Sequence, residues 1–247
     1  MRYELMFPDQ LREAIDKNLP AVMAIGVMEY HSEHCCVGVD TVVVSRALDI
    51  LEKEMEMVIL PPFVYGTASY AVSSPEGKGT ISIGSHTVYL FAKELFGNLL
   101  RVGFRNVHLF IHHQSENFTA GMPTDLALKL AARETIFEFL EKERGEGWWG
   151  KQDMQDYYKK HEKGSDPFSW IQIHPFMDEL SQKQFPIDHA GIQETSLMMA
   201  FCPEGVDMKR HSKDQWYAQS AKDANMDYAN AAKKMILAGM KKALSRK

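Results

Sequence analysis

Two short, mostly apolar runs constrain the fold of this chain more than any other feature of its sequence. Residues 21–27 and 107–111 consist almost entirely of apolar side chains. Such runs are typical of strands that are covered on both faces of a parallel sheet. A third strand is predicted over residues 57–60, where Pro61 and Pro62 end it. Because helical patterns separate the strands, we expect an α/β fold: a three-layer αβα sandwich with a mostly parallel central sheet.

The rest of the chain is expected to complete one domain, residues 1–247. A Gly- and Ser-rich stretch over 65–85 predicts a long functional loop. Residues 145–186 are rich in charges and aromatics with weak periodicity, so we interpret them as an irregular insertion that covers the site or contacts a neighbouring subunit. After a short helix that Pro8 opens, apolar periodicity predicts helices over 40–53, 87–101, 119–143, 192–201 and 213–245.

The composition argues against several classes of protein. The net charge of −5 and the scattered Lys and Arg residues do not suggest a nucleic-acid partner. Three cysteines do not make a disulfide framework, and such a low, odd number suits a reducing compartment. No apolar run approaches the roughly 18 residues of a membrane span, and the first residues do not resemble a signal peptide. We therefore expect a cytoplasmic protein that does not enter membranes.

Polar side chains follow the two buried strands, where ligands bind in parallel sheets. Glu29, His31, His34 and Asp40 come after the first strand, and residues 112–117 (His-His-Gln-Ser-Glu-Asn) come after the other. Carboxylates and imidazoles are ligands of zinc, manganese and iron. Taken alone, the pattern fits a metal site and an exposed polar loop equally well.

Four ordered motifs resemble those of the creatininase family. Residues 26–34 (Gly-Val-Met-Glu-Tyr-His-Ser-Glu-His), which lead to Asp40, are similar to the family's Gly-Ser-x-Glu-x-His-Gly-x-His stretch. Residues 79–82 resemble its Gly-Thr-Ile-Ser element, and residues 103–107 resemble the run into the strand before its second ligand motif. Residues 188–196 closely match its His-Ala-Gly-x-x-Glu-Thr-Ser. Ordered motifs are far more specific than any single one.

The resemblance implies a set of metal ligands. Asp40 would bridge two metals, Glu29 would bind one of them, and His31 with Glu116 would bind the other. The family's second motif reads Asn-Gly-His-x-x-Asn, so Gln114 stands where a ligand histidine is usual. We expect the Gln114 oxygen to ligate more weakly, which would leave one metal site weakened, replaced or empty. One or two divalent metals are implied, with zinc expected and manganese or iron as alternatives.

The third motif supplies the expected catalytic residues, His189 and Glu194. His189 would shuttle protons, since an imidazole titrates near neutrality, and Glu194 would orient it or a metal-bound water. The alternative for Glu194 is ordinary helix N-terminal chemistry. Beyond these two, the side chains that we expect to contact the substrate are His34, His113, Tyr65 and Trp170. His113 is not expected among the ligands, because neighbouring residues at a strand end face opposite ways.

The resulting hypothesis is a metal-dependent hydrolase in which metal-bound hydroxide attacks the carbonyl of a small cyclic or amide-type substrate. Cleavage of a C–C bond in a keto-inositol ring is an alternative, because Gln114 departs from the family pattern. A non-catalytic binding or assembly module on the same scaffold is another, and a thiol hydrolase that uses Cys35 or Cys36 is a third. By resemblance, the chain is expected to form a homo-oligomer, a hexamer built from dimers.

Overall fold

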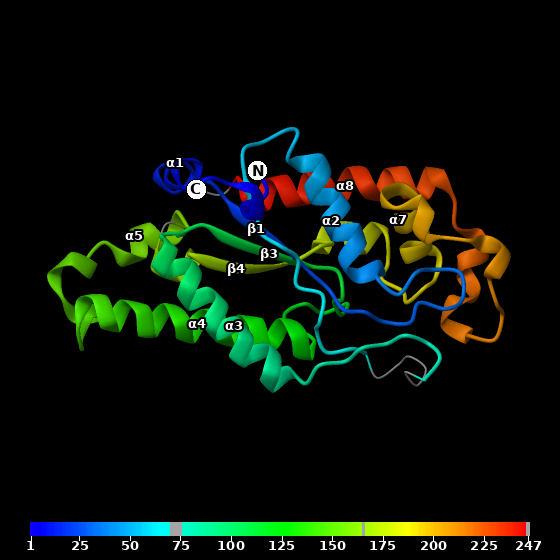
Figure 1. Ribbon diagram of the computed structural model, residues 1–247, viewed down its shortest axis with the longest axis horizontal. Helices are drawn as coiled ribbons and strands as arrows, with labels where there is room; N and C mark the ends of the chain where they lie inside the picture. The colour runs from blue at the N-terminus through cyan, green and yellow to red at the C-terminus, as the bar shows by residue number, and fades with distance from the viewer. Residues whose placement is uncertain (70–75, 165, 246–247) are drawn as a thin grey trace.

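The central sheet contains four parallel strands in the order β2-β1-β3-β4. This computed structural model describes residues 1–69, 76–164 and 166–245 (Figure 1). The strands are β1 (Ala21–Ile25), β2 (Val58–Ile59), β3 (Val107–Ile111) and β4 (Ile171–Pro175). The α-helices are α1 (Pro8–Asp16), α2 (Val39–Leu51), α3 (Ser85–Val102), α4 (Pro123–Arg144), α5 (Tyr157–Glu162), α6 (Glu179–Gln184), α7 (Ile192–Phe201) and α8 (Met226–Leu244).

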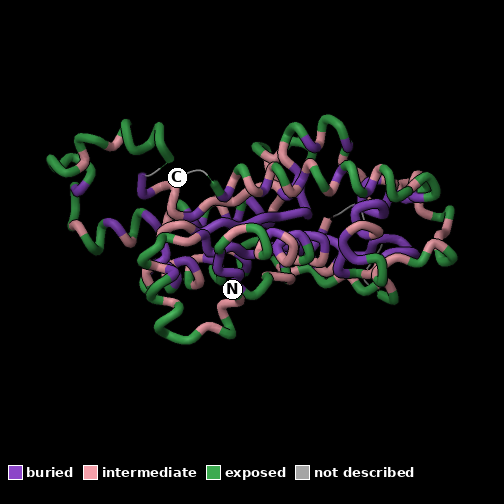
Figure 2. Tube along the Cα trace, turned by 90° about the horizontal axis from the view of Figure 1, so that it is seen from above, coloured by how far each residue is buried: buried purple, intermediate pink, exposed green. Residues whose placement is uncertain are grey.

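Alternate residues of the central strands enter two different hydrophobic cores. Met23 and Ile25 of β1 belong to the core that also contains Phe96 of α3. Val22 of β1 belongs to the core that also contains Val43 of α2 and residues of α7 and α8. Each fully buried aliphatic side chain of this size contributes about 1.5–3 kcal/mol to folding. The sheet thus lies between two helical layers, which confirms the expected three-layer sandwich, and buried residues run through its middle (Figures 1 and 2).

Two segments differ from the sequence-based expectations. Strand β4 lies inside residues 145–186, which we had expected to be irregular, and it extends the sheet beside β3. It was missed because only Ile171 and Ile173 alternate there and, as an edge strand, it is mostly half-buried. The terminal helix is also interrupted: the 3-10 helix η7 (Trp216–Asp223) precedes α8, whose N-cap Asn225 accepts a hydrogen bond from the Tyr228 amide.

Two further observations bear on the predicted loop and on membranes. Of the functional loop predicted over 65–85, residues 70–75 lie outside the described part of the chain. The remainder is irregular as far as Gly84, and α3 begins at Ser85. None of the helices that the structure describes is both long enough and apolar enough to cross a membrane.

Candidate metal centre

The end of β1 is packed directly against the start of α2. A Cβ atom on Gly26 would lie 2.2 Å from the Thr41 Oγ1 atom and 2.6 Å from the Thr41 backbone nitrogen. Only glycine allows the chain to pass so close to α2, and this contact brings the two ends of the loop over residues 26–38 together. Asp40, in the first turn of α2, is thereby brought beside Glu29 and His31, which follow β1.

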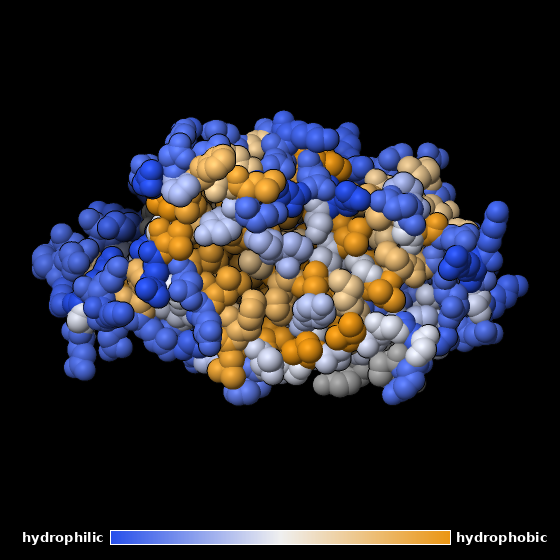
Figure 3. Space-filling view, in the orientation of Figure 1, coloured by the Kyte–Doolittle hydropathy of each residue, from blue (hydrophilic) through white to orange (hydrophobic). Residues whose placement is uncertain are grey.

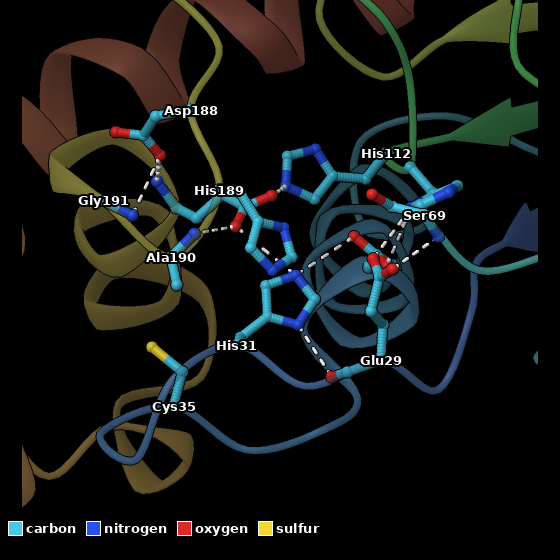
Figure 4. A network of polar contacts seen from close by, with 12 residues as sticks. Glu29, His31, Cys35, Ser69, His112, Asp188, His189, Ala190 and Gly191 are labelled. Carbon is cyan, nitrogen blue, oxygen red and sulfur yellow. Dashed lines mark hydrogen bonds and ion pairs between the residues drawn. The ribbon is translucent and has the colours of Figure 1, made fainter. Parts of the chain in front are cut away.

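Five buried side chains from four segments converge at the carboxyl ends of β1 and β3 (Figure 4). His31 Nε2 lies 3.6 Å from Asp40 Oδ1 and 3.4 Å from Glu194 Oε2. His113 Nδ1, which follows β3, lies 3.2 Å from Glu29 Oε2 and 3.4 Å from Asp40 Oδ2. Two sets of three ligand-type residues therefore share Asp40: Glu29–Asp40–His113 and His31–Asp40–Glu194.

The N-terminal turns of two helices favour negative charge in this cluster. Asp40 and Glu194 lie in the first turns of α2 and α7, where the helix dipoles stabilise carboxylates. Glu194 Oε2 also accepts a hydrogen bond of 2.6 Å from the Ala190 amide. With Glu29, three carboxylates are at most 5% exposed. So much buried negative charge requires positive partners.

In the metal-free protein, protonated histidines supply that positive charge. Burial lowers the pKa of His31, but the nearby carboxylates of Glu194 and Asp40 raise this pKa well above its usual value. Burial likewise opposes charge on His113, yet Asp40 and Glu29 raise the pKa of His113 to about 10. Burial would raise the pKa of the Asp40 carboxyl, but the two histidines hold it well below its usual range.

A divalent cation would satisfy the carboxylate and imidazole atoms of this cluster better than protons on the histidines do. Despite the short separations, Glu29 Oε2, His31 Nε2 and Asp40 Oδ2 have no hydrogen-bond partner among the described residues, although each atom is buried. Buried polar atoms in proteins are normally paired, so the grouping of these three atoms is what a cation-binding site would show. The His31 tautomer is suitable: Nδ1–H donates to the Glu29 carbonyl at 2.9 Å and leaves Nε2 bare toward the carboxylates.

His189 lies against this cluster from the loop before α7. Its ring centroid is 4.4 Å from that of His31, and its Nε2–H donates to the Tyr30 carbonyl at 2.9 Å. Nδ1 therefore remains as the nitrogen that can exchange a proton. Two non-glycine residues in the left-handed region adjoin the site, Ser32 with a φ of 59° and Ala190 with a φ of 51°. Such strain gathers at functional sites.

Comparison with known proteins assigns the chain to a family. The family model described as creatinine amidohydrolase matches residues 4–240, nearly the whole sequence. The chain belongs to the creatininase family. A creatinine amidohydrolase of Pseudomonas putida is 26% identical over 193 residues, which are 76% of this chain and 66% of the relative. The chain thus spans slightly less than two thirds of the length of that curated relative.

Solved creatininase structures share the fold. One described as "Creatininase Mn" superposes with a TM-score of 0.70 at 19% identity and covers 98% of this chain and 96% of its own. A glutamate-to-glutamine creatininase mutant described as "Zn-Zn type" has the same TM-score of 0.70 at 18% identity, with the same coverage of 98% and 96%. At these identities the likeness establishes the fold of the chain.

The second ligand motif of this creatininase-family chain differs from what the sequence suggested. We expected Gln114 to ligate, but its Nε2 donates to the Met177 carbonyl and its Oε1 accepts from the Met177 amide, both at 3.0 Å. The side chain is thus held against the segment after β4. His113 faces the carboxylates instead, so our expectation that it turns the other way is wrong. The strand pattern failed because β3 ends at Ile111 and the chain bends before His113.

Two glutamates lie in positions that the sequence did not suggest. Glu116, the expected ligand, is exposed at the rim of a cleft beside the cluster and belongs to neither of the two sets of ligand-type residues that share Asp40. Glu194, the expected catalytic residue, lies in the cluster itself, 3.4 Å from His31 and 3.4 Å from His112 Nε2. Sequence spacing could not reveal this, because Glu194 reaches the centre from a helix more than 150 positions after His31.

Three residues expected to bind substrate lie elsewhere. The imidazole of His34 is buried behind the cleft, with Nε2 2.9 Å from Thr195 Oγ1. Tyr65 lines a groove of about 340 Å³ with Phe63 and Phe91. Apolar side chains gather over a broad part of the face of the molecule that Figure 3 shows. Trp170 lines a cavity at the opposite end of the sheet, where its ring packs on the Arg105 guanidinium. None of these three side chains therefore lies beside the ligand cluster.

A cleft of about 430 Å³ opens onto the cluster. Trp216 and Tyr217 of η7 line it, although no sequence pattern pointed to them beyond their being adjacent aromatics. The Tyr217 ring packs 5.1 Å from that of His189, and the Trp216 side chain is 80% exposed at the rim. The other lining residues are Asp40, Ser69, His112, His113, Gln114, Ser115, Glu116, Met122, Ile187, Asp188, His189 and Glu194.

Proposed function

We propose that this creatininase-family protein is a metal-dependent hydrolase that cleaves a C–N bond in a small cyclic or amide-type substrate. The observation that carries the proposal is the position of Asp40. Its Oδ1 atom faces His31 and its Oδ2 atom faces His113, so that one carboxylate is shared by two sets of ligands. A shared carboxylate of this kind is what a site for two neighbouring metals requires.

The proposed ligands are Glu29, Asp40 and His113 for one metal, and His31, Asp40 and Glu194 for the other. Two related structures, whose descriptions name Mn and Zn-Zn, support a divalent metal of this type. When bound, such a metal polarises a carbonyl and strengthens water as a nucleophile near neutral pH. Either zinc or manganese is compatible with ligands that are imidazoles and carboxylates.

The residues around the ligands provide the remaining functions. His189, fixed by the Tyr30 carbonyl, is positioned to take a proton from water and return it to the leaving nitrogen through Nδ1. Among the described residues that line the cleft there is no Lys or Arg. A phosphate group in the cleft would therefore meet the metals but no cationic side chain, so the lining itself is suited to an uncharged amide-type substrate.

The test combines metal analysis with a substrate panel. Protein stripped with a chelator is reloaded with zinc or manganese and incubated with creatinine, other cyclic amides, a formamide and a cyclic keto-polyol, and products are sought as the addition of one water. Asp40→Asn should abolish both metal binding and turnover. The matched control on the same helix, Asp49→Asn, should change neither, because Asp49 pairs with Arg2 on the surface.

Two outcomes would contradict the proposal. Absence of bound metal, with no activation by either ion, would leave a binding or assembly module on the creatininase scaffold. Turnover of the keto-polyol alone would move the activity from C–N to C–C cleavage while leaving the metal centre in place.

A further inference from the structure

The segment over residues 79–82 (Gly-Thr-Ile-Ser) lies across the back of the ligand loop. Ile81 pairs with Met28 in an antiparallel bridge, in which the Ile81 amide donates to the Met28 carbonyl at 2.8 Å. Thr80 Oγ1 accepts a hydrogen bond of 3.0 Å from the Tyr30 amide. This motif therefore contacts the backbone that carries Glu29 and His31, although it contributes no side chain to the ligand cluster.

The backbone of Tyr30 joins the ligand loop to the proton-transfer residue. Tyr30 lies between Glu29 and His31 and is only 4% exposed. Its amide donates to Thr80, while its carbonyl accepts the 2.9 Å hydrogen bond from His189 Nε2. Any rotation of this backbone would therefore turn both ligands and release the His189 ring at the same time.

The same segment also fixes the Glu29 side chain by a second route. Ser82 Oγ accepts a hydrogen bond of 3.0 Å from the Ala68 amide. The next amide, that of Ser69, donates to Glu29 Oε1 at 2.5 Å. That contact occupies Oε1 and leaves Oε2 directed at His113. Two hydroxyls of the motif thus support the ligand loop from one side.

We propose that Thr80 is a positioning residue, whose hydroxyl holds the Tyr30 backbone so that Glu29, His31 and His189 keep their orientation toward the metals and the substrate. This inference rests on the proposed function. Partners of this kind, one step removed from the metal, typically change metal affinity about 10–100-fold when removed. Threonine suits the role because its β-branch restricts the side chain to few rotamers.

The test compares Thr80→Val, Thr80→Ser and Thr135→Val in the full-length protein. Thr80→Val keeps the shape of the side chain and removes the acceptor for the Tyr30 amide. Thr80→Ser restores it. Thr135→Val makes the same change at a buried threonine of α4 whose hydroxyl has no hydrogen-bond partner in the described part of the chain and which belongs to neither ligand set. Zinc affinity is measured by competition with a chelating dye, geometry by the visible spectrum of the cobalt-loaded protein, and turnover at saturating metal.

Thr80→Val should bind zinc about 10–100-fold more weakly and show an altered cobalt spectrum. At saturating metal its kcat should remain lower, with KM changed much less, because His189 has lost its fixed acceptor. Thr80→Ser should recover most of both properties, and Thr135→Val should match the wild type. If Thr80→Val fails to fold, Thr80→Ala takes its place: hydrogen exchange of the Tyr30 amide should be slow in the wild type and in Thr80→Ser and faster in Thr80→Ala.

Wild-type zinc affinity, cobalt spectrum and kcat in Thr80→Val would overturn the positioning role and leave the proposed function intact. A loss of stability in Thr80→Val with normal kcat at saturating metal would also overturn it, because that is the signature of a purely structural residue. A wild type that binds no metal would overturn the proposed function, and with it this inference.

Discussion

Replacing His113 should mainly weaken metal binding, whereas replacing Gln114 should mainly lower the stability of the fold. His113→Ala removes the imidazole that lies 3.2 Å from Glu29 and 3.4 Å from Asp40. Loss of a direct ligand should weaken zinc binding by more than the roughly 10–100-fold that loss of an outer partner causes. Because the His113 imidazole also supplies positive charge to Glu29 and Asp40 in the metal-free protein, its removal should increase the repulsion between these carboxylates. Gln114→Ala should leave zinc affinity within a few-fold of the wild type.

The cost of Gln114→Ala in stability follows from its contacts with Met177, which is fully buried. The Met177 carbonyl keeps a second donor, Gln182 Nε2 at 2.9 Å, so it stays paired. The Met177 amide loses its acceptor Gln114 Oε1 and has no replacement among the contacts of the described residues. One orphaned buried donor costs about 1–3 kcal/mol, which in a chain of this size lowers Tm by roughly 2–4 °C per kcal/mol.

Both variants are measured in the metal-free state by urea unfolding and then by zinc titration against a chelating dye, so that metal linkage does not obscure stability. Gln114→His, which restores the usual family residue, is the informative third variant. It should not strengthen zinc binding, because position 114 faces Met177. If Gln114→Ala weakens zinc binding as much as His113→Ala while the free energy of unfolding stays unchanged, our assignment of His113 is refuted.

Three further predictions concern other parts of the molecule. Burial lowers the pKa of His108 from 6.5 to about 4, so the unfolded chain takes up a proton at this histidine before the folded protein does. Up to about 3 kcal/mol of the free energy of unfolding is therefore lost as the pH falls from 6.5 toward 4. In urea unfolding, the free energy of unfolding of His108→Gln should depend less on pH over this range, whereas that of the exposed-site variant His86→Gln should follow the wild type. Because the exposed ring of Trp216 is placed to stack on a substrate, Trp216→Ala should raise KM about 3- to 10-fold with little change in kcat. Trp149→Ala should leave KM unchanged. An unchanged KM in Trp216→Ala would exclude this side chain from substrate binding. Gly26→Ala should lower the free energy of unfolding by about 1–3 kcal/mol and weaken zinc binding, because the new Cβ would lie 2.2 Å from Thr41 Oγ1. Gly150→Ala is the control, because its Cβ would have nothing within 4 Å. Equal stabilities of the two variants in urea unfolding would contradict the steric argument.

The layered fold could be predicted because its signals are local. The apolar runs that became β1 and β3 are fully buried, and the periodicity of α2 and α3 matched their boundaries closely. A strand that is buried on both faces must be continuously apolar, so it can be read without knowledge of its neighbours. Strand β4 lacked that signal, because an edge strand needs only part of its surface to be apolar.

The candidate site was predicted only as far as its location. Motifs after β1 and β3 meet at one sheet edge because parallel strands end together, and Glu29, His31 and Asp40 lie there as expected. The choice between His113 and Gln114 was beyond sequence reasoning. It depends on the backbone of Met177, 63 positions away along the chain, which binds both ends of the Gln114 amide.

The sequence by itself therefore determined the layers, the family and the edge of the sheet where the candidate site lies, because burial patterns and ordered motifs are recorded residue by residue. The tertiary structure decided which side chains face the centre. Glu194 enters from the first turn of α7, Glu116 is exposed, and Trp216 lines the cleft from the first position of η7. These orientations depend on long-range hydrogen bonds and packing, which no local pattern of residues encodes.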